Sequence, residues 1–184
     1  VRNRALAREA FEKALKLSPD LAVAHNLYTY FEIEEMGRPI PAMTRLLGQA
    51  RDHMSDPDLF AGLTLACRFC GLLDASIEAP RRARLLDPKI RTGVHNTYWL
   101  LGDIQTAYDV DDEDAPFSRG HALALLGRKA EAIEIFDRLE KRTQGLEVEF
   151  ARASRAAVEG RLDDLAGILP KLTGGPFRDP EGVY

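Results

Sequence analysis

The chain contains 184 residues, of which 45% are hydrophobic and 29% are charged. This balance is typical of a folded globular protein and excludes collagen-like and wholly disordered chains. A chain of this length can also form a core without disulfides or a structural metal. The net charge of −4, from 25 basic and 29 acidic residues, argues against nucleic acid and anionic lipid as partners.

The hydrophobic pattern predicts an all-α fold, because apolar residues recur at helical spacing and no strand signal competes. Pro41 suits a first helical turn, whereas Pro80 lies inside a predicted helix and should kink or locally unwind it. The predicted helices cover residues 4–17, 21–36, 41–54, 58–70, 73–86, 90–101, 103–109, 115–126, 130–141, 146–159 and 162–172.

Glycines punctuate these helices at regular intervals. Each of five glycines follows an amphipathic run and precedes, by five residues, a small or apolar residue that opens the next run; the glycines are 34, 31, 25 and 33 residues apart. Such a glycine indicates a left-handed turn between antiparallel helices, and a small residue five positions later lets the two helices approach. The pairs are Gly37 and Ala42, Gly71 and Ser76, Gly102 and Ala107, Gly127 and Ala132, and Gly160 and Leu165.

Proline closes three of the helical units, since it cannot continue a helix; these prolines are Pro19, Pro57 and Pro88. The spacing in two segments resembles the tetratricopeptide repeat, a helix–turn–helix unit of about 34 residues. The residues that carry the resemblance are Ala7, Phe11, Ala14, Leu17 and Pro19 in one segment, and Gly71, Ser76, Ala83, Leu86, Asp87 and Pro88 in the other.

The resemblance implies an all-α, right-handed α-solenoid of antiparallel helix hairpins over residues 1–173, with about five repeats and a partial N-terminal one. Residues 174–184 are interpreted as a tail or as the truncated start of a further repeat, and both ends of the chain resemble cuts through a longer solenoid. The repeat that begins near Lys89 departs most from the pattern. We expect its second helix to be short, because five acidic residues fall within residues 109–114.

No motif predicts an enzyme, a cofactor or a metal ion, since the chain lacks a nucleophile elbow and a glycine-rich phosphate loop. Cys67 and Cys70 could form a thiol or metal site, but a structural zinc site needs four ligands, so two small core residues are the favoured interpretation. The four histidines are scattered without metal-binding spacing. Residues 109–114 fail the spacing of a calcium loop and are interpreted as a solvated acidic turn.

A membrane span is not expected, because the most apolar stretch, residues 59–75, contains Arg68 and Asp74 and is shorter than the roughly 20 apolar residues that a bilayer requires. Residues 1–17 carry five basic side chains and no apolar core typical of a signal peptide. Two cysteines without a disulfide pattern favour the reducing cytoplasm.

The resemblance also implies a concave groove lined by the first helix of each repeat, where partner peptides or helices bind. Because only Asn96 matches the positions that hold a peptide carboxylate in some members of the family, we expect an apolar and aromatic groove anchored by Trp99, Phe117 and Phe150. Core packing is the alternative for Trp99 and Phe150, and Arg68 should pair or reach toward water. The predicted groove residues are Leu27, Phe31, Glu34, Leu65, Arg68, Thr92, Asn96, Trp99, Phe117, His121, Phe150 and Ser154.

These patterns predict a non-catalytic scaffold that binds a protein or peptide partner. Residues 66–76 and 95–103 are similar to the repeat tails of bacterial multidomain signalling proteins, which implies that the chain belongs to a larger regulatory protein. The alternative is a structural module that forms a homo-oligomer through its end helices, which a charge introduced near Phe11 would disrupt.

Overall fold

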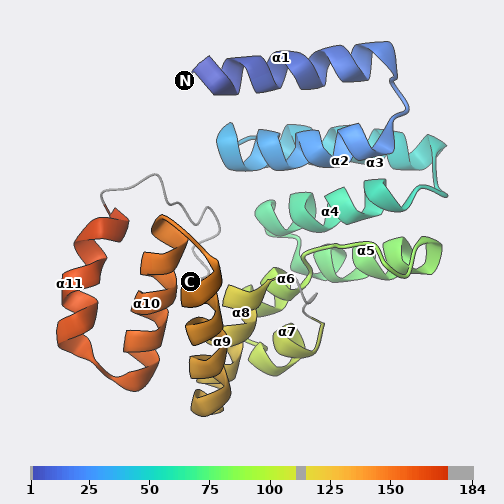
Figure 1. Ribbon diagram of the computed structural model, residues 1–184. Coiled ribbons are helices and arrows are strands. Elements are labelled where there is room, and N and C mark those ends of the chain that lie inside the picture. Colours follow the sequence, from blue (N-terminus) through green and yellow to red (C-terminus); the bar gives the residue numbers. More distant parts are fainter. Residues whose placement is uncertain (1, 111–114, 174–184) are drawn as a thin grey trace. The chain divides into compact units, whose positions relative to one another are not determined.

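The computed structural model describes residues 2–110 and 115–173, and all regular secondary structure in these ranges is helical, as the sequence predicts (Figure 1). The packing divides the chain into two compact units, unit 1 at residues 1–97 and unit 2 at residues 98–184. The sequence predicts one repeat domain over residues 1–173. Most of the predicted acidic turn, residues 111–114, and the predicted tail, residues 174–184, lie outside the described residues.

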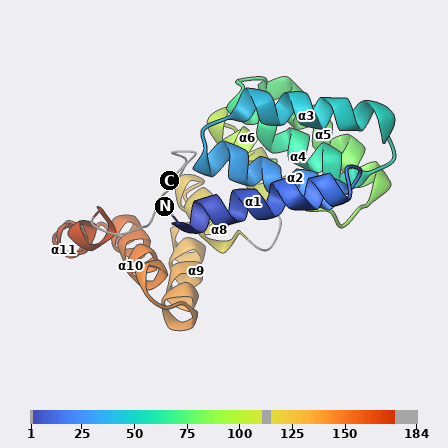
Figure 2. The same cartoon turned by 90° about the horizontal axis from the view of Figure 1, so that it is seen from above.

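Unit 1 is a stack of helices in which each layer packs on the next (Figure 1). Helices α2 and α4 each form a hairpin with the helix that follows, and α4 also packs on α2 and α3. Figure 2 shows α1 lying along α2 at the end of this stack. The helices are α1 (Arg2–Leu17), α2 (Ala22–Tyr30), its π-helical continuation η1 (Phe31–Glu35), α3 (Pro39–Asp52), α4 (Pro57–Phe69) and α5 (Leu73–Leu86).

The core of unit 1 is formed mainly by the facing sides of α3 and α4. Ala42 and Leu46 of α3 and Leu59 and Leu65 of α4 are at most 1% exposed. Two features start these helices slightly before the predicted residues 41 and 58: Pro39 and Pro57 occupy first-turn positions, where proline needs no hydrogen-bond partner, and the Asp56 carboxylate caps α4 by accepting a bond from the Asp58 amide.

Unit 2 repeats the hairpin arrangement (Figure 1). Helix α8 pairs with α9, α10 pairs with α11, and α10 also packs on both α8 and α9. The buried core of this unit contains Leu123, Ala132, Ile135 and Phe136. Its helices are α7 (Ile104–Val110), α8 (Pro116–Leu125), α9 (Lys129–Arg142), α10 (Leu146–Glu159) and α11 (Leu162–Thr173).

The predicted turn geometry is confirmed. All five glycines named above have positive φ angles between 63° and 79°, as a left-handed turn requires. The small residues five positions later are buried at four of the five turns, with 0 to 1% of their surface exposed: Ala42, Ser76, Ala107 and Ala132. Each unit therefore consists of antiparallel helix hairpins packed side by side, the architecture from which α-solenoids are built.

Two local predictions differ from the structure. Helix α6 (His95–Leu100) begins five residues later than the predicted start at residue 90, because Gly93 takes a positive φ of 61° and the Asn96 amide bonds to its carbonyl group. Helix α5 continues unbroken through Pro80, so local unwinding, one of the two effects predicted for this proline, does not occur. Pro80 lies on the buried face of α5 with Ser76 and Ala83, and packing on α4 holds this turn of the helix.

The seven-residue helix α7 confirms that the second helix of this repeat is short. Within the described ranges, no helix combines the length and the apolar composition needed to cross a bilayer.

Candidate functional site

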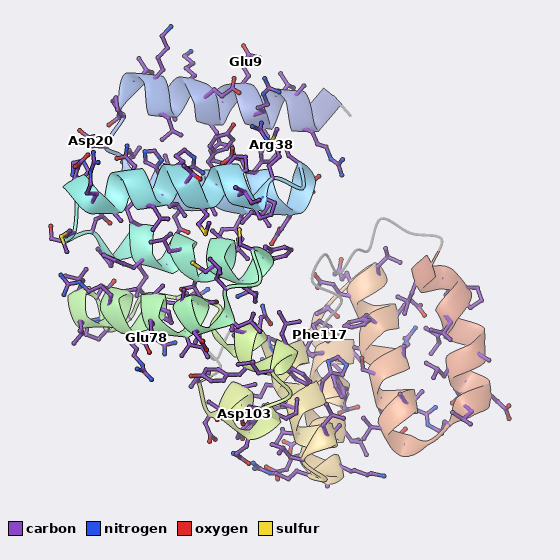
Figure 3. The ribbon with its side chains drawn as sticks, turned by 180° about the vertical axis from the view of Figure 1, so that it is seen from behind. Glu9, Asp20, Arg38, Glu78, Asp103 and Phe117 are labelled. Atoms are coloured by element: carbon purple, nitrogen blue, oxygen red, sulfur yellow. The ribbon has the colours of Figure 1, made fainter. Side chains whose placement is uncertain are left out.

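Four predicted groove residues meet on the neighbouring helices α8 and α10 of unit 2. Phe117 and His121 lie one turn apart on α8, and Phe150 and Ser154 lie one turn apart on α10. The ring centroids of Phe117 and Phe150 are 4.9 Å apart, and those of His121 and Phe150 are 5.7 Å apart. His121 Nε2 lies 3.0 Å from Ser154 Oγ. We call these four residues the aromatic cluster; Figure 3 labels Phe117 at the start of α8.

The aromatic cluster rests on the fully buried ring of Phe136 from α9, whose centroid is 5.0 Å from that of His121. This ring can approach α8 only because residue 120 is glycine: a Cβ atom there would lie 2.7 Å from two carbon atoms of Phe136. Phe117 and Phe150 themselves are half-buried and retain some exposed surface. The cluster is therefore a supported aromatic surface rather than a loose set of side chains.

His121 is held in its neutral form. Burial lowers its pKa from 6.5 to about 4, against the opposing effect of a hydrogen bond with the Phe117 backbone. Its contact with Ser154 superficially resembles the base and nucleophile of a hydrolase. However, the Ser154 residue is only 6% exposed, and the second partner of the imidazole is a backbone group instead of a carboxylate. The pair therefore positions α10 against α8.

The lowered pKa of His121 predicts a loss of stability in mild acid. The imidazole of His121 binds a proton near pH 6.5 in the unfolded chain and only near pH 4 in the folded chain. The free energy of unfolding is therefore highest above pH 6.5 and decreases as the pH falls toward 4. Between pH 7 and pH 5, His121 should lower the free energy of unfolding by about 2 kcal/mol, which urea denaturation at each pH measures.

The control for this experiment is a comparison of one variant with the wild type. His121→Gln should flatten the pH dependence of the free energy of unfolding. His25, whose pKa burial also lowers, remains in both proteins and supplies a residual slope. An unchanged slope in His121→Gln would contradict the assignment.

Trp99 and Ser118 connect α6 to α8 within unit 2. The indole Nε1 of half-buried Trp99 donates a 2.9 Å hydrogen bond to the Ser118 hydroxyl group, and Ser118 is 1% exposed. This bond fixes the tryptophan against the helix that carries Phe117.

The predicted groove residues of unit 1 fall into two groups. Leu27 and Glu34 are exposed along α2 and η1, and Phe31 packs beside Phe11 with ring centroids 5.8 Å apart. The others are withdrawn from the surface: Leu65 is 1%, Arg68 5% and Thr92 1% exposed, and Asn96 is half-buried.

Arg68 pairs inside unit 1 instead of reaching water. Its Nη1 atom donates to the Gly93 carbonyl group at 3.2 Å and lies 3.5 Å from Thr97 Oγ1. Thr97 in turn shares a 2.7 Å hydrogen bond with the buried Ser76 hydroxyl group. The arginine thus satisfies backbone and hydroxyl oxygens between α4 and the start of α6.

Cys67 is a buried core residue, and Cys70 is half-buried one turn later; both are free thiols. Burial raises the pKa of each thiol, which reduces the reactive thiolate form at neutral pH. Over residues 2–110 and 115–173, no group of three histidine, cysteine or acidic side chains could hold a metal ion.

Unit 2 contains a cavity that the sequence did not predict. A cavity of about 420 Å³ lies between the start of α8 and the end of α9, and three arginines, Arg119, Arg138 and Arg142, line it. The available signal is the spacing on α9, where Arg138 and Arg142 alternate with Ile135 and Leu139 on one helical face.

Comparison with known proteins gives a limited result. No family model matches the chain, and no curated protein matches it. Among solved structures, a chain in the structure of Naa15/Naa10 bound to HypK-THB is similar, with 16% sequence identity and a TM-score of 0.46. The match covers 92% of this chain and 28% of that chain. The fold assignment therefore rests on the helix hairpins described above.

Proposed function

We propose that this chain is a non-catalytic scaffold, part of a larger regulatory protein, that binds a peptide or helix of a partner protein at the aromatic cluster. The observation that carries this proposal is the meeting of half-buried Phe117 and Phe150 on neighbouring first helices, with ring centroids 4.9 Å apart. Aromatic side chains that are already packed make efficient anchors, because they offer large apolar contact and lose little conformational freedom when a partner binds.

Photo-crosslinking provides the first test. A photoreactive phenylalanine analogue placed at position 117 should crosslink to a defined protein in the cells that produce this chain, whereas the same group at exposed Lys129 on α9 should not. Mass spectrometry identifies the crosslinked peptide. Equal crosslinking from both positions would count against a site at the aromatic cluster.

Calorimetry with the partner so identified then measures the contribution of each ring. Phe117→Ala should weaken binding by at least about tenfold, as expected for an interface anchor. The matched control is Leu125→Ala, which removes an apolar side chain that is 65% exposed at the other end of α8 and should leave affinity within about twofold. Circular dichroism of each variant establishes that the fold is retained.

Self-association is a second candidate, and one observation favours it. Helix α11 exposes Leu162 and Leu169, which are 70% and 46% exposed and share one helical face. In contrast, Phe11 of α1 points inward, with its ring centroid 5.3 Å from that of Tyr28, and Glu9 of the same helix is directed away from α2 (Figure 3). Leu162 is therefore a better position to test than the neighbourhood of Phe11.

Sedimentation velocity separates the two candidates. A dimer that forms with rising concentration and is abolished by Leu162→Glu would support a self-association module. A monomer at all concentrations, with crosslinking at position 117 retained, would support the scaffold.

A further inference from the structure

The cavity between α8 and α9 has an unusual combination of apolar and cationic walls. Its volume is about 420 Å³, and among residues 2–110 and 115–173 six side chains line it, of which three are guanidinium groups and three are apolar. None of these six side chains is acidic. The lining residues are Pro116, Arg119, Ile135, Arg138, Leu139 and Arg142, and we call this site the arginine pocket.

The apolar floor of the arginine pocket belongs to the core of unit 2. Ile135 is 9% exposed, and half-buried Leu139 packs against the same core cluster. Arg138 and Arg142 follow Ile135 at i+3 and i+7 on α9, so the two exposed arginines border this floor on the same helical face. A ligand that fills the pocket would contact aliphatic carbon below and guanidinium groups at the rim.

Carboxylates neutralise the arginines of this pocket unequally within the described part of the chain. Arg119 donates a 2.9 Å hydrogen bond to the Tyr108 hydroxyl group, lies 4.4 Å from the centre of that ring and interacts electrostatically with Glu131. Arg138 forms a long ion pair with Glu134, in which Nη2 and Oε1 are 4.0 Å apart. Among residues 2–110 and 115–173, no carboxylate forms an ion pair with Arg142.

The start of α8 adds to the positive potential. The N-terminal residues Pro116 and Arg119 of this ten-residue helix line the pocket, and no side chain caps the helix at Ala115. The positive end of the helix dipole therefore lies at the pocket. This concentration of positive charge attracts anions to the pocket, although the chain as a whole carries a net charge of −4.

We propose that the arginine pocket binds an acidic peptide segment of a partner protein, in which carboxylates pair with the guanidinium groups and an apolar side chain contacts Ile135 and Leu139. Guanidinium groups match carboxylates in planar, two-bonded geometry. The apolar floor distinguishes such a peptide from a free phosphate ion, which has no apolar part. This site differs from the aromatic cluster in all its residues, so either assignment can fail without the other.

Fluorescence anisotropy with a designed probe tests the proposal on the full chain. The probe is a short labelled peptide in which pairs of glutamates alternate with single leucines, and the comparison peptide carries glutamine in place of glutamate. The glutamate peptide should bind, its affinity should fall as salt is raised, and the glutamine peptide should bind at least about tenfold more weakly.

Paired variants locate the binding. R138Q/R142Q should weaken binding of the glutamate peptide by at least about tenfold, and R138K/R142K should weaken it less, because lysine keeps the charge but loses the fork geometry. The matched control is R51Q/R81Q, which makes the same charge change at two exposed arginines of unit 1 and should leave affinity unchanged.

Three results would overturn the proposal: no binding of the glutamate peptide, an equal loss in the unit 1 control, or equal binding of the glutamine peptide. Displacement of the peptide by inorganic phosphate alone, or tighter binding of a single-stranded oligonucleotide, would reassign the pocket to phosphate groups. Circular dichroism of R138Q/R142Q verifies that the loss does not come from unfolding.

Discussion

Arg45→Met is expected to lower the free energy of unfolding by about 3 kcal/mol, since removal of one member of a buried ion pair leaves the other uncompensated. Arg45 of α3 donates to Glu32 Oε2 at 2.7 Å, to Thr29 Oγ1 at 3.0 Å and contacts His25 Nδ1 at 2.8 Å. Glu32 is 5% exposed, so water cannot replace the arginine. One side chain thus satisfies three polar groups on the helix facing it.

The measurement is urea denaturation followed by circular dichroism. Arg51→Met is the matched control, because Arg51 lies on the same helix, is 81% exposed and, within the described part of the chain, bonds only to the neighbouring Asp52; it should cost less than about 0.5 kcal/mol. In the double variant Glu32→Leu/Arg45→Met, part of the loss should be recovered, because no charge remains buried. Equal effects of Arg45→Met and Arg51→Met would contradict the role given to the network.

Gly120→Ala is expected to destabilise unit 2 by about 2 to 3 kcal/mol through overpacking. The added Cβ atom would lie 2.7 Å from Cε1 and Cζ of Phe136, and that ring is fully buried. The clash arises at the contact between α8 and α9 on which the aromatic cluster rests. Partner binding at Phe117 should weaken together with stability.

A compensating substitution distinguishes this clash from a general effect of alanine. Phe136→Leu shortens the opposing side chain, so Gly120→Ala should cost less in the Phe136→Leu background than in the wild type. Gly48→Ala is the matched control: Gly48 is also helical, no atom lies within 4 Å of its added Cβ, and the change should stabilise by about 0.5 to 1 kcal/mol. Additive effects of the two unit 2 substitutions would rule out the proposed contact.

The hairpin pattern was predictable because it depends on local chemistry. A left-handed turn favours glycine at any site, and a close helix contact needs a small residue such as Ala132 at a fixed distance from it. The late start of α6 was not predictable from periodicity. The apolar spacing of this segment is typical of a helix from residue 90, but Gly93 interrupts the helix in the structure.

The aromatic cluster was predictable for a related reason. Phe117 and His121, like Phe150 and Ser154, are four residues apart on the first helices of neighbouring hairpins, so helical periodicity together with the resemblance to the tetratricopeptide repeat predicted that they share one face. The same spacing also predicted Leu65 and Arg68 as groove residues, but both are buried. Apart from Thr64, residues 61–67 of their helix are apolar side chains or glycine, a pattern that indicates a covered helix.

The polar contacts of unit 1 and the arginine pocket were beyond sequence reasoning, because each combines side chains from different helices. Arg45 and Glu32 are separated by 13 residues and a turn, and no spacing rule relates them. Similarly, Arg119 joins Arg138 only through the packing of α8 on α9.

The bond between Trp99 and Ser118 gives the molecule a built-in optical reporter. Trp99 is the single tryptophan of the chain, and it is fixed to α8 by a hydrogen bond within unit 2. Its fluorescence emission therefore reports on the unfolding of residues 98–184, whereas the ellipticity measured by circular dichroism reports on the helices of both units. Recorded on one sample, the two signals reveal whether the halves of this protein melt in one step or in sequence.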